Sequence, residues 1–185
     1  INRNMSKKIV ITGGIGYIGT ELCKIYSGYS WNNEIVVIDN RFISERVNQI
    51  RNWNMNFVHG DILDKELIKK YCKDADIVHH LAGVTDVPRT QSDSNKDKDA
   101  KILEVAELGT QNILDAISDK CKIILPSTHV VYEGIEKVKN NIPEDERIRP
   151  VLSYSNSKAI NEKQLKDSGK NYIILRLGSV YGYST

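Results

Sequence analysis

The sequence predicts an α/β fold, a doubly wound parallel sheet with helices on both faces, in one domain over residues 1–185. Short apolar runs alternate along the chain with segments of helical periodicity, which is typical of parallel strands joined by crossover helices. A glycine-rich turn follows the first apolar run, and an aspartate ends the second. A length of 185 residues suits one well-packed α/β domain and is short for two large ones.

The stretch KKIVITGGIGYIG, residues 7–19, predicts a strand, a turn and the start of a helix. Ile9 to Ile11 form an apolar run of the kind that a parallel sheet buries on both faces. Gly13, Gly16 and Gly19 follow at three-residue spacing. In such a turn the glycines permit an unusual backbone conformation, a close approach of the main chain to a pyrophosphate, and close helix packing. We interpret the stretch as a phosphate cradle at a helix N-terminus.

A second apolar strand, residues 35–38, ends in Asp39 and strengthens this interpretation. Asp39 lies 39 − 19 = 20 residues beyond Gly19, where a dinucleotide site of the Rossmann fold places the acid that binds the ribose hydroxyls. A carboxylate at this position repels a 2′-phosphate, so we expect NAD to bind more tightly than NADP. Arg41, two residues further on, is a cation that could oppose this preference.

The other elements follow from the same periodicities. The first helix is expected from Tyr17 to about Tyr26, with Gly28 ending it, and its apolar face is expected to consist of Ile18, Leu22 and Ile25. Further helices are expected over residues 42–53, 64–71, 99–117 and 154–165, and further strands over 56–59, 77–81, 123–125 and 172–177. Asp64 is the expected N-cap of its helix. The polar run 85–99 is expected to be a mobile loop at the mouth of the site or, with equal weight, a solvated surface loop.

Charge and cysteine content limit the partners that the chain can have. A net charge of +2 provides no long-range field for nucleic acid or an anionic membrane. No apolar run reaches membrane-spanning length, and the first residues lack an apolar signal core. Cys23, Cys72 and Cys121 are odd in number and lack paired metal-ligand spacing, so we expect no metal site and reduced, buried thiols in a cytoplasmic protein.

Tyr154 and Lys158 lie four residues apart at the start of a predicted helix, so both side chains project from one face. A nearby ammonium favours tyrosinate, so we expect a lowered pKa that makes Tyr154 a general acid and base. Thr128 supplies a hydroxyl at the carboxyl end of the fifth strand, where ligands bind in open α/β sheets. Four other polar residues receive structural interpretations. They are His79 and His80, as satisfied structural histidines, and Glu133 and Glu162, as solvated carboxylates.

Together these motifs resemble the extended short-chain dehydrogenase/reductases, and within them the NAD-dependent nucleotide-sugar epimerases and dehydratases. The resemblance covers the whole chain and is closest to the UDP-galactose 4-epimerase-like group. It rests on TGGIGYIG (12–19), Asp39, HGD (59–61), HLAG (80–83), GT (109–110), STHVVY (127–132), YSNSK (154–158) and LRLGSVYG (175–182).

The resemblance implies a role for each matching residue. The implied cofactor-binding set is Gly13, Gly16, Tyr17, Ile18, Gly19, Asp39, Asn40, Asp61, Ile62, Leu81, Ala82, Gly83, Tyr154 and Lys158. In it the three glycines bind the pyrophosphate, Asp39 the adenosine ribose, Asp61 with Ile62 the adenine, and Ala82 with Gly83 the nicotinamide side. Tyr154 is the implied acid and base, Lys158 holds the nicotinamide ribose, and Thr128 hydrogen-bonds the reacting oxygen.

The resemblance implies an enzyme that epimerises a UDP- or TDP-linked sugar by transient oxidation at a sugar carbon, and a homodimer in the full-length protein. Dehydratases of the family follow the catalytic threonine with Asp-Glu, whereas His129 and Val130 stand here, which disfavours dehydration. A sugar or sterol oxidoreductase, a nucleotide-sugar decarboxylase, and a non-catalytic NAD-binding module remain alternatives. The last is suggested by Ala106, where the family has an asparagine. A substrate lobe is expected after residue 185.

Overall fold

The computed structural model describes residues 6–84, 95–137 and 139–182. Its strands are β1 (Lys8–Thr12), β2 (Glu34–Asp39), β3 (Asn56–His59), β4 (Ile77–His80), β5 (Lys122–Thr128) and β6 (Asn171–Leu177). Its helices are α1 (Tyr17–Ser27), α2 (Ser44–Asn52), α3 (Lys65–Cys72), α4 (Lys96–Ala116), the 3₁₀ turn η2 (His129–Tyr132) and α5 (Ser153–Asp167). Strands and helices alternate as predicted.

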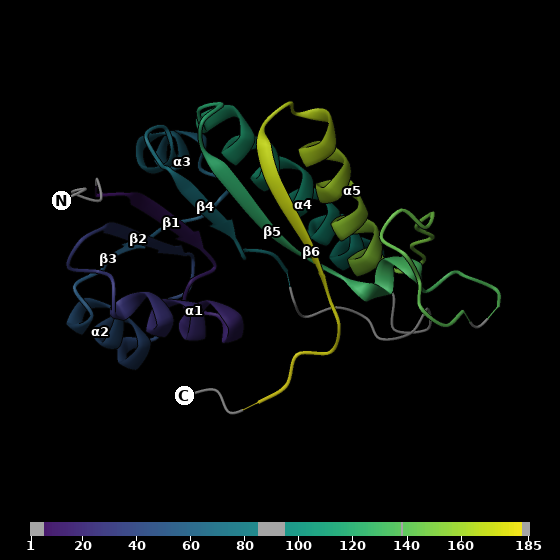
Figure 1. Ribbon diagram of the computed structural model, residues 1–185, viewed down its shortest axis with the longest axis horizontal. Helices are drawn as coiled ribbons and strands as arrows, with labels where there is room; N and C mark the ends of the chain where they lie inside the picture. Colours follow the sequence, from purple (N-terminus) through teal and green to yellow (C-terminus); the bar gives the residue numbers. More distant parts are fainter. Residues whose placement is uncertain (1–5, 85–94, 138, 183–185) are drawn as a thin grey trace.

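The six strands form one parallel sheet in the order β3-β2-β1-β4-β5-β6. The order reverses between β1 and β4, because β2 and β3 lie on one side of β1 whereas β4 to β6 lie on the other. Figure 1 shows the sheet with its carboxyl ends turned toward the segment that leaves β6. This arrangement confirms the predicted doubly wound sheet, in which ligands bind at such a switch point.

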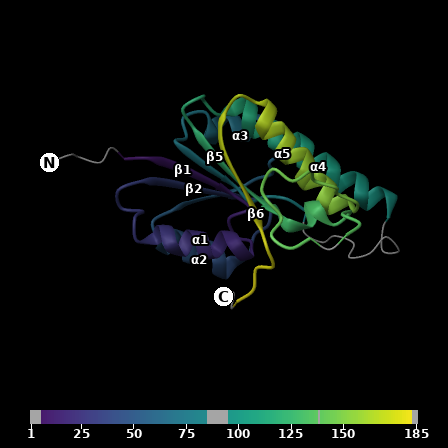
Figure 2. The same ribbon diagram turned by 45° about the vertical axis from the view of Figure 1, so that its right-hand side comes forward.

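Helices cover both faces of the sheet, and Figure 2 shows α1 and α2 on one side and α3, α4 and α5 on the other. Neighbouring residues of β1 point to opposite faces, so Ile9 and Ile11 pack with α1 and α2 while Val10 packs with α3 and α4. Each face therefore has its own apolar core. No helix in the described ranges is long and apolar enough to cross a membrane.

The predicted apolar face of α1 is wrong for two of its three residues, because only Leu22 packs against the core. Ile18 and Ile25 are 37% and 67% exposed, and the residues that α1 buries are Gly19, Thr20 and Cys23. Close packing on the glycine turn selects this face, because the backbone of Gly19 lies directly against the turn. The buried residues of α1 are small because of that contact, and the spacing of large apolar side chains in the sequence does not indicate this face.

Helix α4 begins three residues earlier than predicted, at Lys96 and not at Asp99. The side chain of Asn95 accepts hydrogen bonds from the N–H groups of Asp97 and Lys98, at 3.0 and 3.4 Å, and so caps the helix. The Lys/Asp run is therefore the first turn of a helix. The rest of the predicted loop, residues 85–94, lies outside the described residues.

The three cysteines are buried and unpaired, as predicted. Burial raises the pKa of the Cys23 and Cys72 thiols to about 12 and that of Cys121 to about 11. Thiols of this kind behave as small apolar side chains and are poor nucleophiles.

Candidate active site

A cavity of about 860 Å³ opens at the carboxyl ends of the strands. Every residue that the sequence analysis assigned to catalysis or to cofactor binding lines it. These residues come from the loops after β1, β2, β3 and β4, from the end of β2 and of β5, and from the first turns of α1 and α5, so the fold brings together segments that are far apart in the sequence. Gly178 and Val180, in the segment after β6, also line the cavity, and the hydroxyl of Tyr17 donates to the carbonyl of Gly182 at 2.6 Å. Figure 1 shows this segment leaving β6 and running back toward α1.

The glycine turn brings the backbone close to its neighbours at two positions. Gly13 has a positive φ of 68°, and a Cβ there would lie 2.6 Å from the backbone nitrogen of Ala82. A Cβ on Gly19 would lie 2.4 Å from the carbonyl oxygen of Gly13. Gly16 is the N-cap of α1, and the first turn of that helix contains no acidic residue. The helix therefore begins at the cavity without a carboxylate that would repel an anion.

Asp39 lies almost fully buried at the end of β2, where it lines the cavity. Its carboxylate accepts the N–H of Ile15 at 3.2 Å and the N–H and Nε–H of Arg41 at 3.0 and 3.3 Å. These bonds tie the acid both to the glycine turn and to a cation that lines the same cavity. Asp61 is held in a similar way, since it accepts from the Asn40 amide at 3.0 Å and the N–H of Leu63 at 2.9 Å.

Arg46 also lines the cavity, and the sequence analysis missed it. Its Nη1 donates to the carbonyl of Ile15 at 2.6 Å, so a guanidinium stands beside the glycine turn. The sequence carries one signal for it: Arg46 lies in the first turn of α2, the helix that follows Asp39. Ser127, Ser157 and Asn161 line the cavity as well and were not assigned to the site.

Tyr154 and Lys158 lie one turn apart at the start of α5, and the Lys158 Nζ is 5.9 Å from the centroid of the Tyr154 ring. Lys158 donates no hydrogen bond to any other residue of the described ranges, so its ammonium is available to a ligand in the cavity. Burial lowers the pKa of Lys158 to about 8. Thr128 ends β5, and its Oγ1 accepts the N–H of Val130 at 3.3 Å.

The expected lowering of the Tyr154 pKa is wrong for the chain by itself. Burial raises the pKa of this phenol, because removing it from water disfavours the charged phenolate. Lys158 is itself desolvated, and its ammonium lies 5.9 Å from the ring centroid, so its attraction does not reverse the effect of burial. A cationic cofactor would add a charge that the chain alone does not provide.

His79 and His80 are structural, as predicted. His80 is buried between two threonines, with Nδ1 2.9 Å from the Thr12 hydroxyl and Nε2 2.9 Å from the Thr110 hydroxyl. Burial, reinforced by the positive charge of Lys158, lowers the pKa of His80 to about 3, so the ring stays neutral. His79 Nε2 lies 2.8 Å from the hydroxyl of Tyr26.

Of the two carboxylates predicted to be solvated, Glu133 is exposed as predicted, although it is also hydrogen-bonded, whereas the prediction for Glu162 is wrong. Glu133 accepts the N–H groups of Val151 and Leu152, both at 2.8 Å, and the hydroxyl of Ser155. It therefore anchors the chain where α5 begins. Glu162 is fully buried and hydrogen-bonded to strands β5 and β6. A carboxylate in a helical sequence is usually solvated, and here the partners come from strands distant in the sequence.

Comparison with known proteins gives consistent relatives. The chain is 30% identical to dTDP-D-glucose 4,6-dehydratase of Dictyostelium discoideum, covering 95% of this chain and 44% of that protein. It is 30% identical to CDP-paratose 2-epimerase of Salmonella typhi, covering 95% and 58% respectively. The crystal structure of UDP-glucose 4-epimerase from Brucella ovis in complex with NAD superposes with a TM-score of 0.72 at 28% identity, covering 92% of this chain and 51% of that one. The chain thus spans about half the length of the relatives it matches.

The family model named "NAD dependent epimerase/dehydratase family" matches residues 9–185. This match includes the glycine turn, Asp39, Thr128, Tyr154 and Lys158, which are the residues that meet at the cavity. The chain belongs to the NAD-dependent epimerase/dehydratase family.

Proposed function

We propose that this chain is the NAD-binding domain of a nucleotide-sugar epimerase. The observation that carries the proposal is that one cavity brings together two sets of groups. The first set, the glycine turn and Asp39, fits a dinucleotide. The second set, Tyr154, Lys158 and Thr128, fits proton transfer at a sugar hydroxyl. The Salmonella typhi relative and the Brucella ovis structure are named as epimerases, which supports this reaction class.

The residues at the cavity fit NAD in three ways. Gly16 leaves the first turn of α1 open to a pyrophosphate, Asp39 offers carboxylate oxygens toward a ribose, and Lys158 offers an ammonium with no other hydrogen bond within the described ranges. NAD, when bound, would accept a hydride from a sugar carbon and return it to the opposite face. Asp39 also opposes a 2′-phosphate, which favours NAD over NADP, although Arg41 and Arg46 stand close by.

The chain's own residues would move the proton. Tyr154 would take the proton of the reacting sugar hydroxyl and give it back after the keto sugar has turned over. Thr128, at the end of β5, would donate a hydrogen bond to the reacting oxygen. Lys158 would hold the ribose next to the nicotinamide and would favour the Tyr154 phenolate once its charge acts together with that of the cofactor.

A dehydratase is the second candidate, because one of the relatives is a dTDP-D-glucose 4,6-dehydratase. Elimination of water needs its own acid and base beside the catalytic threonine. The two residues after Thr128 do not supply them: Val130 is apolar, and His129 Nδ1 lies 3.2 Å from the carbonyl of Leu177. This local chemistry favours epimerisation.

The full-length protein is proposed to act on a UDP- or TDP-linked sugar, as a homodimer in the cytoplasm. The buried, unpaired cysteines support a reducing compartment. Three alternatives to the epimerase remain: a sugar or sterol oxidoreductase, a decarboxylase, and a non-catalytic NAD-binding module. The oxidoreductase would release NADH in step with substrate, whereas the epimerase would convert one sugar into another without accumulating NADH.

Two measurements test the proposed function. Calorimetric titration of the chain with NAD and with NADP should give tighter binding of NAD, and equal or tighter binding of NADP would contradict the role of Asp39. The full-length protein, supplied with UDP- and TDP-sugars, should interconvert epimers with no net change in absorbance at the NADH wavelength. Binding of NAD without conversion of any nucleotide sugar would favour the non-catalytic module.

A further inference from the structure

Helix α5 carries Tyr154 and Lys158, yet it is fixed to the protein mainly by polar contacts. Its buried residues are Ser155, Ser157, Asn161, Glu162 and Leu165, of which only Leu165 is a large apolar side chain. Apolar contacts are non-directional, whereas hydrogen bonds fix the rotation and the position of a helix. The placement of the helix that carries the candidate acid and base therefore depends on a few directional contacts.

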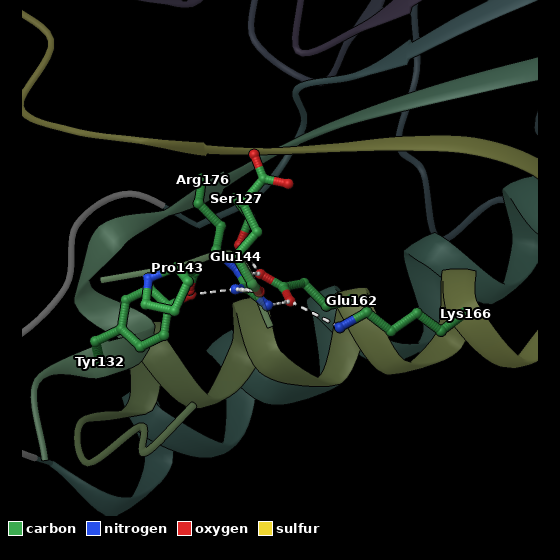
Figure 3. Close-up of polar contacts among 7 residues, drawn as sticks. All are labelled: Ser127, Tyr132, Pro143, Glu144, Glu162, Lys166 and Arg176. Atoms are coloured by element: carbon green, nitrogen blue, oxygen red, sulfur yellow. Dashed lines mark hydrogen bonds and ion pairs between the residues drawn. The ribbon is translucent and has the colours of Figure 1, made fainter. Parts of the chain in front are cut away.

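The most extensive of these contacts is made by Glu162, which is four residues beyond Lys158 on the same stripe of the helix. The Nε and Nη2 of Arg176 donate to its two carboxylate oxygens at 2.9 and 2.7 Å, a bidentate pair. The hydroxyl of Ser127 donates to Oε1 at 2.7 Å, and the Nζ of Lys166 donates to Oε2 at 3.3 Å. Figure 3 shows the carboxylate enclosed by these donors from β5, β6 and α5.

The partners of Glu162 lie next to Thr128. Ser127 immediately precedes it in β5, and Arg176 pairs in register with Ser127 across the β5–β6 ladder. Arg176 also donates through Nη1 to the Glu144 carbonyl at 2.8 Å and to the hydroxyl of Tyr132, the last residue of the 3₁₀ turn after Thr128. Ser127, just before Thr128, is thus bound to Glu162. The turn after Thr128 is bound through Tyr132 to Arg176. The Glu162–Arg176 ion pair therefore holds the chain on both sides of Thr128 to α5.

We infer that the Glu162–Arg176 pair is a positioning device, which holds α5 against the carboxyl ends of β5 and β6 and so sets Tyr154 and Lys158 relative to Thr128. The inference rests on the proposed function for its consequence in catalysis, but the geometry that it describes is independent of any ligand. Neither Glu162 nor Arg176 is placed in contact with substrate or cofactor, so both act through the residues that they hold.

The half-buried Lys158 provides a readout that a merely stabilising pair would not move. If α5 is released from β5 and β6, Lys158 becomes more accessible to water, and its pKa should rise from about 8 toward the ordinary value of 10.5. Removal of the Glu162 charge alone would act in the opposite direction, because a lost anion disfavours the ammonium. The double variant Glu162→Gln/Arg176→Gln removes one charge of each sign and isolates the geometric effect.

The experiment is an NMR titration of the chain labelled with ¹³C at lysine Cε, with Lys158→Met used to assign its signal. The Glu162→Gln/Arg176→Gln variant should raise the Lys158 midpoint by about one unit. The matched control, Lys163→Gln/Asp167→Asn, removes an exposed pair four residues apart on the same helix and should leave the midpoint unchanged. A midpoint that stays at about 8 or falls in a folded double variant would overturn the inference.

A second variant covers the case in which the double variant does not fold. Arg176→Lys keeps the charge but loses the bidentate geometry, so it should raise the Lys158 midpoint in the same direction by a smaller amount. An unchanged midpoint in folded Arg176→Lys would then count against the inference. Neither titration requires NAD or a sugar, so a wild-type chain that fails to bind NAD would contradict the proposed function while the titration still decides the positioning role.

Discussion

Tyr154 is the residue on which the proposed chemistry depends most directly. Replacement of Tyr154 by Phe removes the hydroxyl while it keeps the ring, so the packing at the start of α5 should persist. Turnover of the full-length protein should fall by about 10²–10⁴-fold, whereas NAD affinity should stay within about twofold, since the pyrophosphate and adenosine contacts lie elsewhere. Steady-state kinetics and calorimetry measure the two effects. Near-normal turnover in Tyr154→Phe would require another base.

Glu162 should make the stability of the chain depend on acid pH. Burial alone would raise the pKa of Glu162, but hydrogen bonds from Arg176 and Ser127 outweigh burial and hold it below its ordinary value. The contribution of a group with a depressed pKa is present above its unfolded pKa, about 4.3, and is lost as pH falls through its folded pKa. Glu162→Gln should cost about 3–5 kcal/mol near neutral pH, because it leaves Arg176 buried without its partner.

This cost should shrink as the pH falls below about 4, because the wild-type carboxylate is then protonated as well. Urea denaturation of wild type and Glu162→Gln across acidic and neutral pH measures the difference. Asp167→Asn, which changes an exposed carboxylate of the same helix, is the control and should show a small effect. A wild-type to Glu162→Gln difference that is constant with pH would show that the carboxylate charge is not the source.

Single residues of the site differ in how far the sequence determines their role. Tyr154, Lys158 and Thr128 could be predicted to share a site. Thr128 stands at the carboxyl end of a strand, and the other two residues stand near the start of the helix that follows. In a parallel sheet with crossover helices, these two ends face the same edge of the sheet. Glu162 could not be assigned correctly, since its partners Ser127 and Arg176 come from two other strands. A helical spacing shows which side chains share a face but not what that face meets.

At the scale of one element, two glycines of the glycine turn are expected to have different roles. Gly19 is expected to contribute to stability, and Gly16 to the binding of NAD. Gly19→Ala should destabilise the fold by about 1–3 kcal/mol or more, because its Cβ would lie 2.4 Å from the Gly13 carbonyl oxygen and 2.6 Å from the Gly14 Cα, both backbone atoms. Gly16→Ala meets nothing closer than 3.1 Å and has an ordinary φ of −73°, so its stability should change little.

Binding should show a different pattern for these two variants. The Cβ of Gly16→Ala would stand at the cavity surface where a pyrophosphate approaches the helix, so NAD affinity should fall by about tenfold or more in a normally folded protein. Urea denaturation and calorimetry on both variants separate the effects. A Gly16→Ala variant with wild-type NAD affinity would contradict the proposed phosphate cradle.

Element boundaries followed closely from the sequence where apolar periodicity determines them, and less well where polar contacts do. Strand β3 was predicted with its observed bounds, 56–59, because two apolar residues at its centre, Phe57 and Val58, pack against the cores on opposite faces of the sheet. The start of α4 was missed because Asn95 caps a run of lysines and aspartates that carries no apolar signal. The buried face of α1 was missed because contact with the glycine turn requires small residues there.

At the scale of the whole molecule, β6 is an edge strand within the described ranges and pairs only with β5. Tyr172, Ile173 and Leu175 are exposed along it, and a cavity of about 990 Å³ adjoins the strand. Unpaired backbone groups beside exposed apolar side chains form a template for association with another chain. The strand order places these exposed apolar side chains at an edge of the sheet within the described ranges.

The chain should therefore self-associate through β6 at concentrations of tens of micromolar and above, with the free edge as the contact. Ile173→Lys places a charge on the edge strand and should shift the chain toward monomer in sedimentation velocity. Ile25→Lys is the matched control, since Ile25 is more exposed, at 67% against 38% for Ile173, but lies on α1 away from the edge. Circular dichroism checks that both variants fold. If both lysine variants reduced association equally, general apolar exposure and not the β6 edge would be its cause, and a wild-type chain that stayed monomeric would contradict the prediction outright.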